Sequence, residues 1–129
     1  MADTSADAVK TGVHSRANRL YAYPFATIYP LYVTKLARKG RSTAELDELI
    51  EWLLGYSPAE VQAHIVAGTT TQAFVDAGRL NPASGLITGV ICGVRVEEIA
   101  EPTMRRIRYL DKLVDELYKG KAMEKVLRG

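Results

Sequence analysis

The chain has 129 residues, 47% of them hydrophobic, with a single cysteine and a formal net charge of +2. A domain of this length buries enough surface to fold without a structural metal, and one cysteine excludes an intramolecular disulfide. The longest nearly apolar stretch, Leu86 to Val94, is far shorter than the roughly 20 residues of a membrane-spanning helix, so we expect no membrane partner and a cytoplasmic location.

The N-terminal part of the chain is the hardest to interpret. Residues 1–19 are small and polar, lack the apolar core of a signal peptide, and predict a disordered tail before a single domain over residues 20–129. Residues 25–39 have a helical pattern but contain Pro30, which removes a backbone donor and clashes with the preceding turn. We therefore expect either a kink at Pro30 or a helix that begins there, rather than one straight helix.

Two helices with clear start signals follow, at residues 43–54 and 58–67. Each is preceded by a serine, and a glutamate stands three positions later, which is the capping-box pattern. Apolar residues recur at helical spacing in the first of them and predict one buried face. The capping pairs are Ser42 with Glu45 and Ser57 with Glu60.

Four further helices complete the expected fold, at residues 70–77, 82–92, 102–119 and 121–127. The third of these is the longest and has an apolar stripe of period 3.6. The only candidate strand, residues 94–96, is too short to be convincing. We therefore predict an all-α single domain of six to eight short helices with one long C-terminal amphipathic helix. Its expected core comprises Leu46, Leu49, Ile50, Trp52 or Leu53, Ile87, Val90, Ile91, Ile107, Leu110, Val114 and Leu117.

Glycines and the cysteine in the predicted 82–92 segment suggest close packing. Gly85, Gly89 and Gly93 are four residues apart, so on a helix they share one face and allow another helix to approach closely, in the chain or across a homodimer. We expect Cys92, in the same apolar run, to be a small buried residue. The spacing also fits a helix-turn-helix, but three glutamates on the second helix, Glu97, Glu98 and Glu101, argue against DNA reading.

Several short motifs, in this order along the chain, resemble the bacterial family catalogued as domain of unknown function 2200. The resemblance runs from about Leu20 to the C-terminus and implies a small all-α fold. It implies no activity, substrate or cofactor. The motifs are Tyr29–Val33, Lys35, Arg38–Arg41, Trp52–Leu53, Gly55–Tyr56, Leu80–Pro82, Ile87–Val90, Cys92–Glu97, Arg108–Leu113 and Gly120–Lys125.

Charge is unevenly distributed along the chain. Residues 1–41 carry a net charge of +5, residues 42–101 a net charge of −7 and residues 102–129 a net charge of +4. One interpretation is that the basic ends attract the acidic middle within the fold. The other is that they bind a polyanion, with tyrosines among the N-terminal cations stacking on the bases of a nucleic acid.

The candidate contact residues are the polar side chains that recur in the family motifs. They would contact a ligand or partner, or else cap and bridge helices, as Asn81 before Pro82 would do. These candidates are Tyr29, Tyr32, Lys35, Asn81, Arg95, Tyr109, Asp111 and Lys112.

The sequence contains no recognisable catalytic motif, cofactor motif or metal-binding motif. His14 and His64 lack a second ligand at metal-binding spacing, and no phosphate-binding glycine loop is present. Our first hypothesis is a small protein-interaction or homo-oligomerisation module without catalytic activity. The alternatives are a sequence-tolerant nucleic-acid binder that uses the basic, tyrosine-rich N-terminal third, and an enzyme with a dispersed polar site.

Overall fold

The computed structural model describes residues 19–128 and is mostly helical, which confirms the predicted all-α class. The tail predicted for residues 1–19 lies outside the described residues, apart from Arg19. After a helical turn at 19–22, the elements are α2 (Phe25–Ala37), α3 (Thr43–Leu54), α4 (Pro58–Ala67), α5 (Thr71–Ala77), η1 (Pro82–Leu86), β1 (Val90–Ile91), β2 (Val94–Arg95), η2 (Val96–Glu98), α6 (Pro102–Tyr118) and α7 (Met123–Val126).

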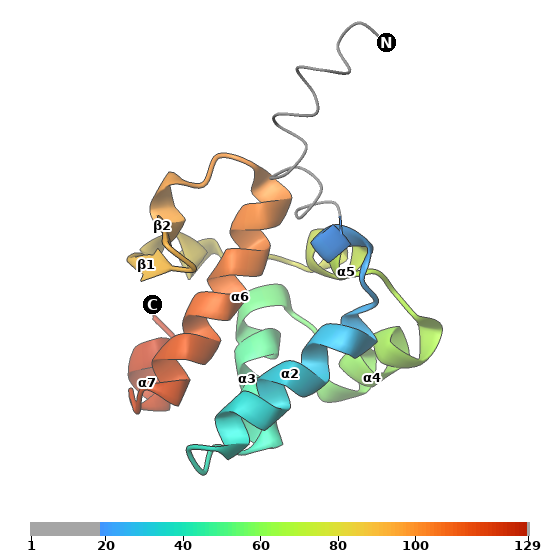
Figure 1. The fold of residues 1–129 in the computed structure, drawn as a ribbon, viewed down its shortest axis with the longest axis horizontal. Coiled ribbons are helices and arrows are strands. Elements are labelled where there is room, and N and C mark those ends of the chain that lie inside the picture. The colour runs from blue at the N-terminus through green and yellow to red at the C-terminus, as the bar shows by residue number, and fades with distance from the viewer. Residues whose placement is uncertain (1–18, 129) are drawn as a thin grey trace, which may run out of the picture.

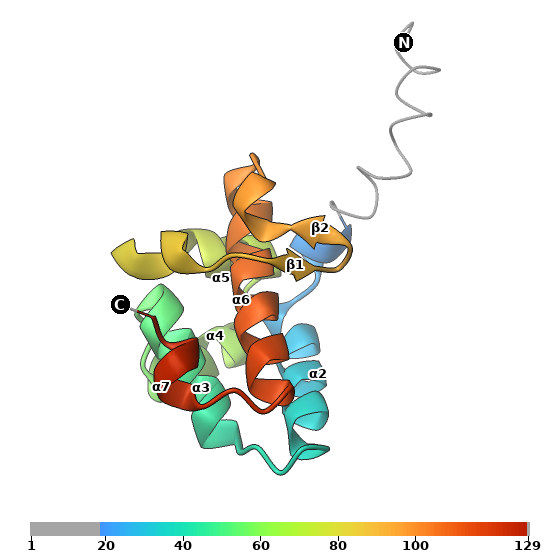
Figure 2. The ribbon, with the colours of Figure 1, turned by 90° about the vertical axis from the view of Figure 1, so that its left-hand side faces the viewer.

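The long helix α6 is the central element of the fold. It contacts α2, α3, α5, α7, β1 and η2, so segments from the whole described chain meet on its surface. Figure 1 shows α2 and α6 running toward the same end of the molecule, with α7 beside the end of α6. The view in Figure 2 places the β1–β2 hairpin beside the upper half of α6.

The core lies between α3 and α6, where the apolar stripes predicted from the sequence face each other. Leu46, Leu49, Ile50 and Leu53 of α3 have no exposed surface. The matching positions of α6 are Ile107, Leu110, Val114 and Leu117, and each is at most 3% exposed. Both predicted capping boxes are present, at Ser42 with Glu45 and at Ser57 with Glu60.

Helix α2 continues through Pro30, so the prediction that a new helix begins there is wrong. The helix tolerates proline because Pro30 itself is exposed, and the carbonyl left without its partner lies on a face that water can reach. The opposite face of α2 is fixed by the burial of Phe25, Tyr29 and Leu36. Tertiary packing therefore outweighs the local cost of the proline.

The predicted helix over residues 82–92 is wrong, because the chain forms a short 3₁₀ helix and then a hairpin. Strands β1 and β2 pair antiparallel and are joined by Cys92 and Gly93, whose φ angles are 52° and 79°. A two-residue turn with two positive φ angles matches the right-handed twist of paired strands. Gly89, at φ 108°, also departs from helical geometry.

The hairpin corrects three further expectations. The glycines of this region do not share a helix face, and the helix-turn-helix alternative is excluded by the same geometry. Cys92 is exposed rather than buried, because it occupies the tip of the turn. Val90, predicted in the core, is 52% exposed, whereas Ile91 on the opposite face of the strand is partly buried.

Two glycines outside left-handed backbone make a matched pair for testing the packing. A Cβ added at Gly78 would lie 2.8 Å from Cβ of Leu54 and 3.0 Å from its carbonyl oxygen, whereas one added at Gly85 meets no atom within 4 Å. We expect Gly78→Ala to lower the free energy of unfolding by about 1–3 kcal/mol through overpacking. Gly85→Ala should raise it by about 0.4–1 kcal/mol, because alanine restricts the unfolded chain.

Urea denaturation followed by circular dichroism measures both variants. Equal effects of the two substitutions would contradict the close contact between Gly78 and α3.

Candidate functional site

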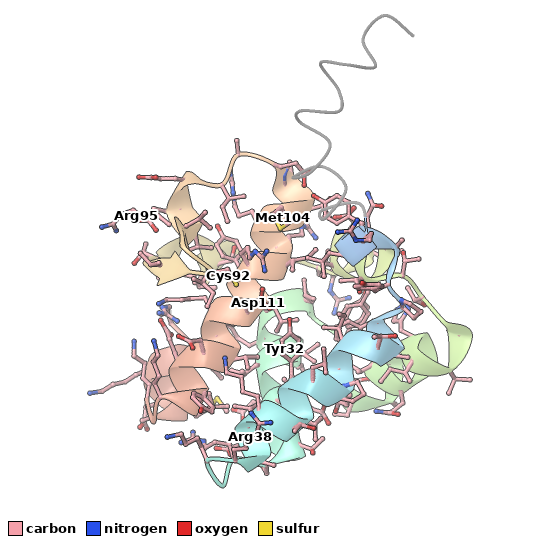
Figure 3. The ribbon with its side chains drawn as sticks, in the orientation of Figure 1. Tyr32, Arg38, Cys92, Arg95, Met104 and Asp111 are labelled. Carbon is pink, nitrogen blue, oxygen red and sulfur yellow. The ribbon has the colours of Figure 1, made fainter. Side chains whose placement is uncertain are left out.

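A polar cluster joins α2, α6 and the hairpin turn. The Tyr32 hydroxyl of α2 donates to one carboxylate oxygen of Asp111 in α6, at 2.6 Å, and Arg108 donates to the other at 2.7 Å. The same guanidinium nitrogen of Arg108 lies 3.4 Å from Sγ of Cys92. Figure 3 shows Tyr32, Asp111 and Cys92 following one another across the gap between α2 and the hairpin.

Burial and charge fix the ionisation states in this cluster. Burial, together with the charge of Asp111 and its hydrogen bond, raises the pKa of Tyr32 well above its usual value. Although burial opposes the charged form of Arg108, the hydrogen bond and charge of Asp111 raise the pKa of Arg108. Tyr32 is therefore held as a neutral donor, and Asp111 is satisfied by one neutral and one charged group.

Two further tyrosines of the N-terminal segment donate to carboxylates in the same way. Tyr29 donates to Asp47 of α3 at 2.5 Å, and Tyr21 donates to Glu101, which caps the start of α6. Burial, then the hydrogen bond and the charge of the carboxylate, raises the pKa of Tyr29 and of Tyr21. With Tyr32, these hydroxyls tie the N-terminal segment to two other helices, and they are not free to contact a ligand.

Next to this cluster, Asp115 of α6 gathers lysines from two helices. Its oxygens lie 3.5 Å from Nζ of Lys35 in α2 and 3.0 Å from Nζ of Lys119. Partial burial opposes the charge of Asp115, but the hydrogen bond and charge of Lys119, with a further contribution from Lys35, lower its pKa. Nζ of Lys35 and Nζ of Lys39 also lie over the Tyr118 ring, 5.0 and 5.1 Å from its centroid.

A hollow of about 570 Å³ lies between the end of α6 and α7, and lysines line it. Glu116 on its inner side is 9% exposed and is paired with Arg128 at 2.6 Å and Lys121 at 3.7 Å. The lysines at the hollow are Lys112, Lys119, Lys121 and Lys125. The hollow therefore combines carboxylates that are already neutralised with an excess of positive charge.

These lysines form one surface, which we call the basic face: Lys35, Lys39, Lys112, Lys119, Lys121 and Lys125. The carboxylates beneath it, Asp115 and Glu116, have side chains only 13% and 9% exposed, whereas Lys119 is 70% exposed. Glu124 is the exposed carboxylate on α7. The cations of the basic face therefore reach water while most of the opposite charge is buried.

The basic face combines the two basic ends of the sequence. Lys35 and Lys39 come from the N-terminal basic segment, and the other four lysines come from the C-terminal one. Within residues 19–128, the ion pair that links a basic end to the acidic middle is the local pair of Arg41 with Glu45, one helical turn apart. Attraction between the ends and the middle therefore does not account for where these lysines lie.

The eight candidate residues divide into two groups. Tyr32, Lys35 and Asp111 lie together where α2 meets α6, whereas Lys112 of α6 lies against the hairpin, where its Nζ donates to the Val90 carbonyl at 3.1 Å. The other four are separate from them and from one another. Tyr29 is buried against α3, Tyr109 is 6% exposed in the core, Asn81 caps η1 and binds the Trp52 carbonyl, and Arg95 pairs with Glu97 on the hairpin.

Sequence reasoning missed Arg108, Asp115, Lys119, Lys121 and Lys125 as members of the site. Arg108, Lys121 and Lys125 belong to motifs that carry the family resemblance, so they were available as candidates. Asp115 and Lys119 form an i, i+4 pair of the kind that usually stabilises an exposed helix face. The pair becomes part of a larger site because α2 packs beside α6 and brings Lys35 next to Asp115.

The described residues provide little for metal chemistry. Among residues 19–128, no group of three or more His, Cys, Asp or Glu side chains is placed to hold a metal ion. His64 bonds through Nδ1 to the Thr69 hydroxyl at 2.9 Å and packs edge-on against Tyr56 and Phe74. Within the same residues, none of the helices combines the length and apolar character needed to cross a bilayer.

The fold and site define a class of small helical domain with lysines from both ends of the chain on one face. A family model described as "uncharacterized protein conserved in bacteria (DUF2200)" matches residues 19–128, so the chain belongs to this family and the predicted resemblance is confirmed. The crystal structure of the uncharacterized protein SP1917 is similar, with a TM-score of 0.80 and 42% identity over 84% of this chain and 90% of that chain. The comparison with curated proteins found no match.

Proposed function

We propose that this protein binds nucleic acid through the basic face, by contacting phosphates without reading base sequence. The observation that carries the proposal is the gathering of six lysines from both basic ends over carboxylates that are mostly buried. Exposed lysines supply phosphate contacts that carry no sequence information, and counterion release supplies the free energy. This proposal keeps the nucleic-acid alternative, but its main contacts are the lysines of the basic face rather than the tyrosines of the N-terminal third.

The first hypothesis, a protein-interaction or homo-oligomerisation module, loses the features that motivated it. The glycines expected on one helix face lie in a 3₁₀ helix and a hairpin, and the apolar stripe of α6 is buried within the chain. A homodimer therefore stays a prediction, which the mass in solution by light scattering can test. A dispersed enzyme site is also less favoured, because Tyr29, Asn81, Arg95 and Tyr109 do not converge.

A cytoplasmic location and a single domain beginning near residue 20 are part of the same proposal. The single free thiol, Cys92, supports a reducing compartment. The packing of α2, α3, α5 and α7 on α6, and of α4 on α2 and α3, supports one domain.

Charge reversal on the basic face tests the proposal. We expect Lys39→Glu and Lys125→Glu each to weaken binding of a fluorescein-labelled 20-nucleotide probe by about 10-fold at 50 mM salt, since each removes about one phosphate contact. Binding by the wild-type chain should fall about 100-fold between 50 and 200 mM salt if about four phosphates are contacted. Fluorescence anisotropy measures both, with the probe presented as a single strand and as a duplex.

Arg95→Glu is the matched control, because it makes the same change of charge at an exposed side chain on the hairpin. It should leave binding within about twofold, and circular dichroism should show all variants folded. Absence of binding to every probe at low salt contradicts the proposal. Tighter binding to poly-glutamate than to nucleic acid also contradicts it and favours an acidic protein as the partner.

A further inference from the structure

We propose that the basic face, if it binds nucleic acid as above, binds the double helix in preference to single strands. Two features carry this inference. The aromatic side chains near the face already contact carboxylates or lysines of the chain itself. The lysines form two rows, one along the end of α2 and one along the end of α6.

Single-strand binders use exposed aromatic rings as stacking platforms, worth about 1–3 kcal/mol per base. The rings near the basic face do not serve this purpose. Tyr32 is partly buried with its hydroxyl on Asp111, and Tyr29 is buried with its hydroxyl on Asp47. The Tyr118 ring is already occupied by the ammonium groups of Lys35 and Lys39, which both lie over it. Without a free ring, a single strand gains phosphate contacts alone.

The lysines form two rows that the fold holds at a fixed separation. One row is Lys35 on α2 and Lys39 in the turn after it, and the other is Lys112 on α6 and Lys119 at its C-terminal cap. The Tyr32–Asp111 and Lys35–Asp115 contacts hold the two helices together. Packed helices lie about 8–10 Å apart.

This separation is comparable to the grooves of B-DNA, about 6 Å wide in the minor groove and about 12 Å in the major groove. Two lysine rows can therefore contact phosphates on both sides of one groove. A double helix already holds its phosphates at fixed positions. A flexible single strand must lose conformational entropy before its phosphates can contact both rows of lysines. Arg38, the C-cap of α2, lies at the lower end of that helix in Figure 3 and adds a cation between Lys35 and Lys39 in the sequence.

The experiment compares four probes of equal length at one salt concentration: a 20-bp DNA duplex, a 20-bp RNA duplex, and unstructured DNA and RNA single strands. We expect at least one duplex to bind about 10-fold tighter than both single strands. Lys39→Gln in the α2 row and Lys119→Gln in the α6 row should each reduce this preference. Arg95→Gln, the matched control, should leave it unchanged.

The outcomes separate this inference from the proposed function. Single strands that bind as tightly as the duplexes overturn the inference but leave nucleic-acid binding intact. Loss of single-strand binding in Tyr118→Leu, with duplex binding retained, also overturns it, because that result shows stacking on Tyr118. If no probe binds, the proposed function fails and the inference fails with it. The relative affinities of the DNA and RNA duplexes identify which double helix the two rows fit.

Discussion

Replacing Phe74 with alanine is expected to lower the free energy of unfolding by about 3–5 kcal/mol, a large share of the stability of a small domain. Phe74 has no exposed surface, and its ring lies 3.9 Å from that of Phe25 and 4.6 Å from that of Tyr56 between centroids. The Tyr56 hydroxyl also donates to the Phe74 carbonyl at 2.8 Å. Truncation leaves a cavity among the rings of Phe25 on α2, His64 on α4 and Tyr56 in the loop before α4.

Urea denaturation, followed through circular dichroism and Trp52 fluorescence, measures this change. Phe74→Leu is the matched control, since it keeps most of the apolar volume and should cost clearly less. A loss below about 1.5 kcal/mol for the alanine variant would show that the neighbouring rings collapse into the space, contrary to a rigid aromatic cluster.

The free energy of unfolding is expected to fall steeply as the pH rises above about 10, the usual pKa of tyrosine in an unfolded chain. The pKa values of Tyr21, Tyr29 and Tyr32 are raised in the fold, because each hydroxyl is partly or fully buried and donates to a carboxylate. Above pH 10 the unfolded chain loses these protons while the folded chain keeps them. Stability is therefore fully present below the unfolded pKa and is lost as the pH approaches the folded pKa values.

Tyr32→Phe isolates one of these contributions. The variant should be less stable than wild type at neutral pH, because Asp111 loses a donor, but its stability should decline less between pH 10 and 12. Tyr23→Phe, at a tyrosine that is 45% exposed, is the control. Chemical denaturation at a series of pH values measures the slopes. Equal slopes for wild type and Tyr32→Phe would contradict a folded state that holds the Tyr32 proton.

The helices that the sequence predicted well are those with local signals. Helix α3 has a capping box, a stop at Gly55 with φ 77°, and a long apolar stripe, so each of its boundaries is specified within a few residues. The 82–92 segment had a start signal at Asn81 and Pro82, but only a short apolar run followed it. A short apolar run with glycines is compatible with either a helix or strands. In the structure this run forms a hairpin, whose turn has positive φ angles at Cys92 and Gly93.

The candidate site was predictable only in part. The charge count along the chain located the two basic ends, and the family motifs selected Tyr32, Lys35, Asp111 and Lys112. Their partners could not be deduced, because the Tyr32–Asp111 and Lys35–Asp115 contacts join residues about 80 positions apart. The role of the tyrosines could not be deduced for the same reason. Their spacing among N-terminal cations suggested base stacking, whereas in the structure their hydroxyls donate hydrogen bonds to carboxylates.

The position of Cys92 at the tip of the hairpin has a practical consequence. The chain has one cysteine, and this residue is exposed in the hairpin turn. A maleimide dye or spin label can therefore be attached to the native chain at one defined point, without engineering a cysteine. Such a reporter would allow distances from the hairpin to a bound partner to be measured by energy transfer.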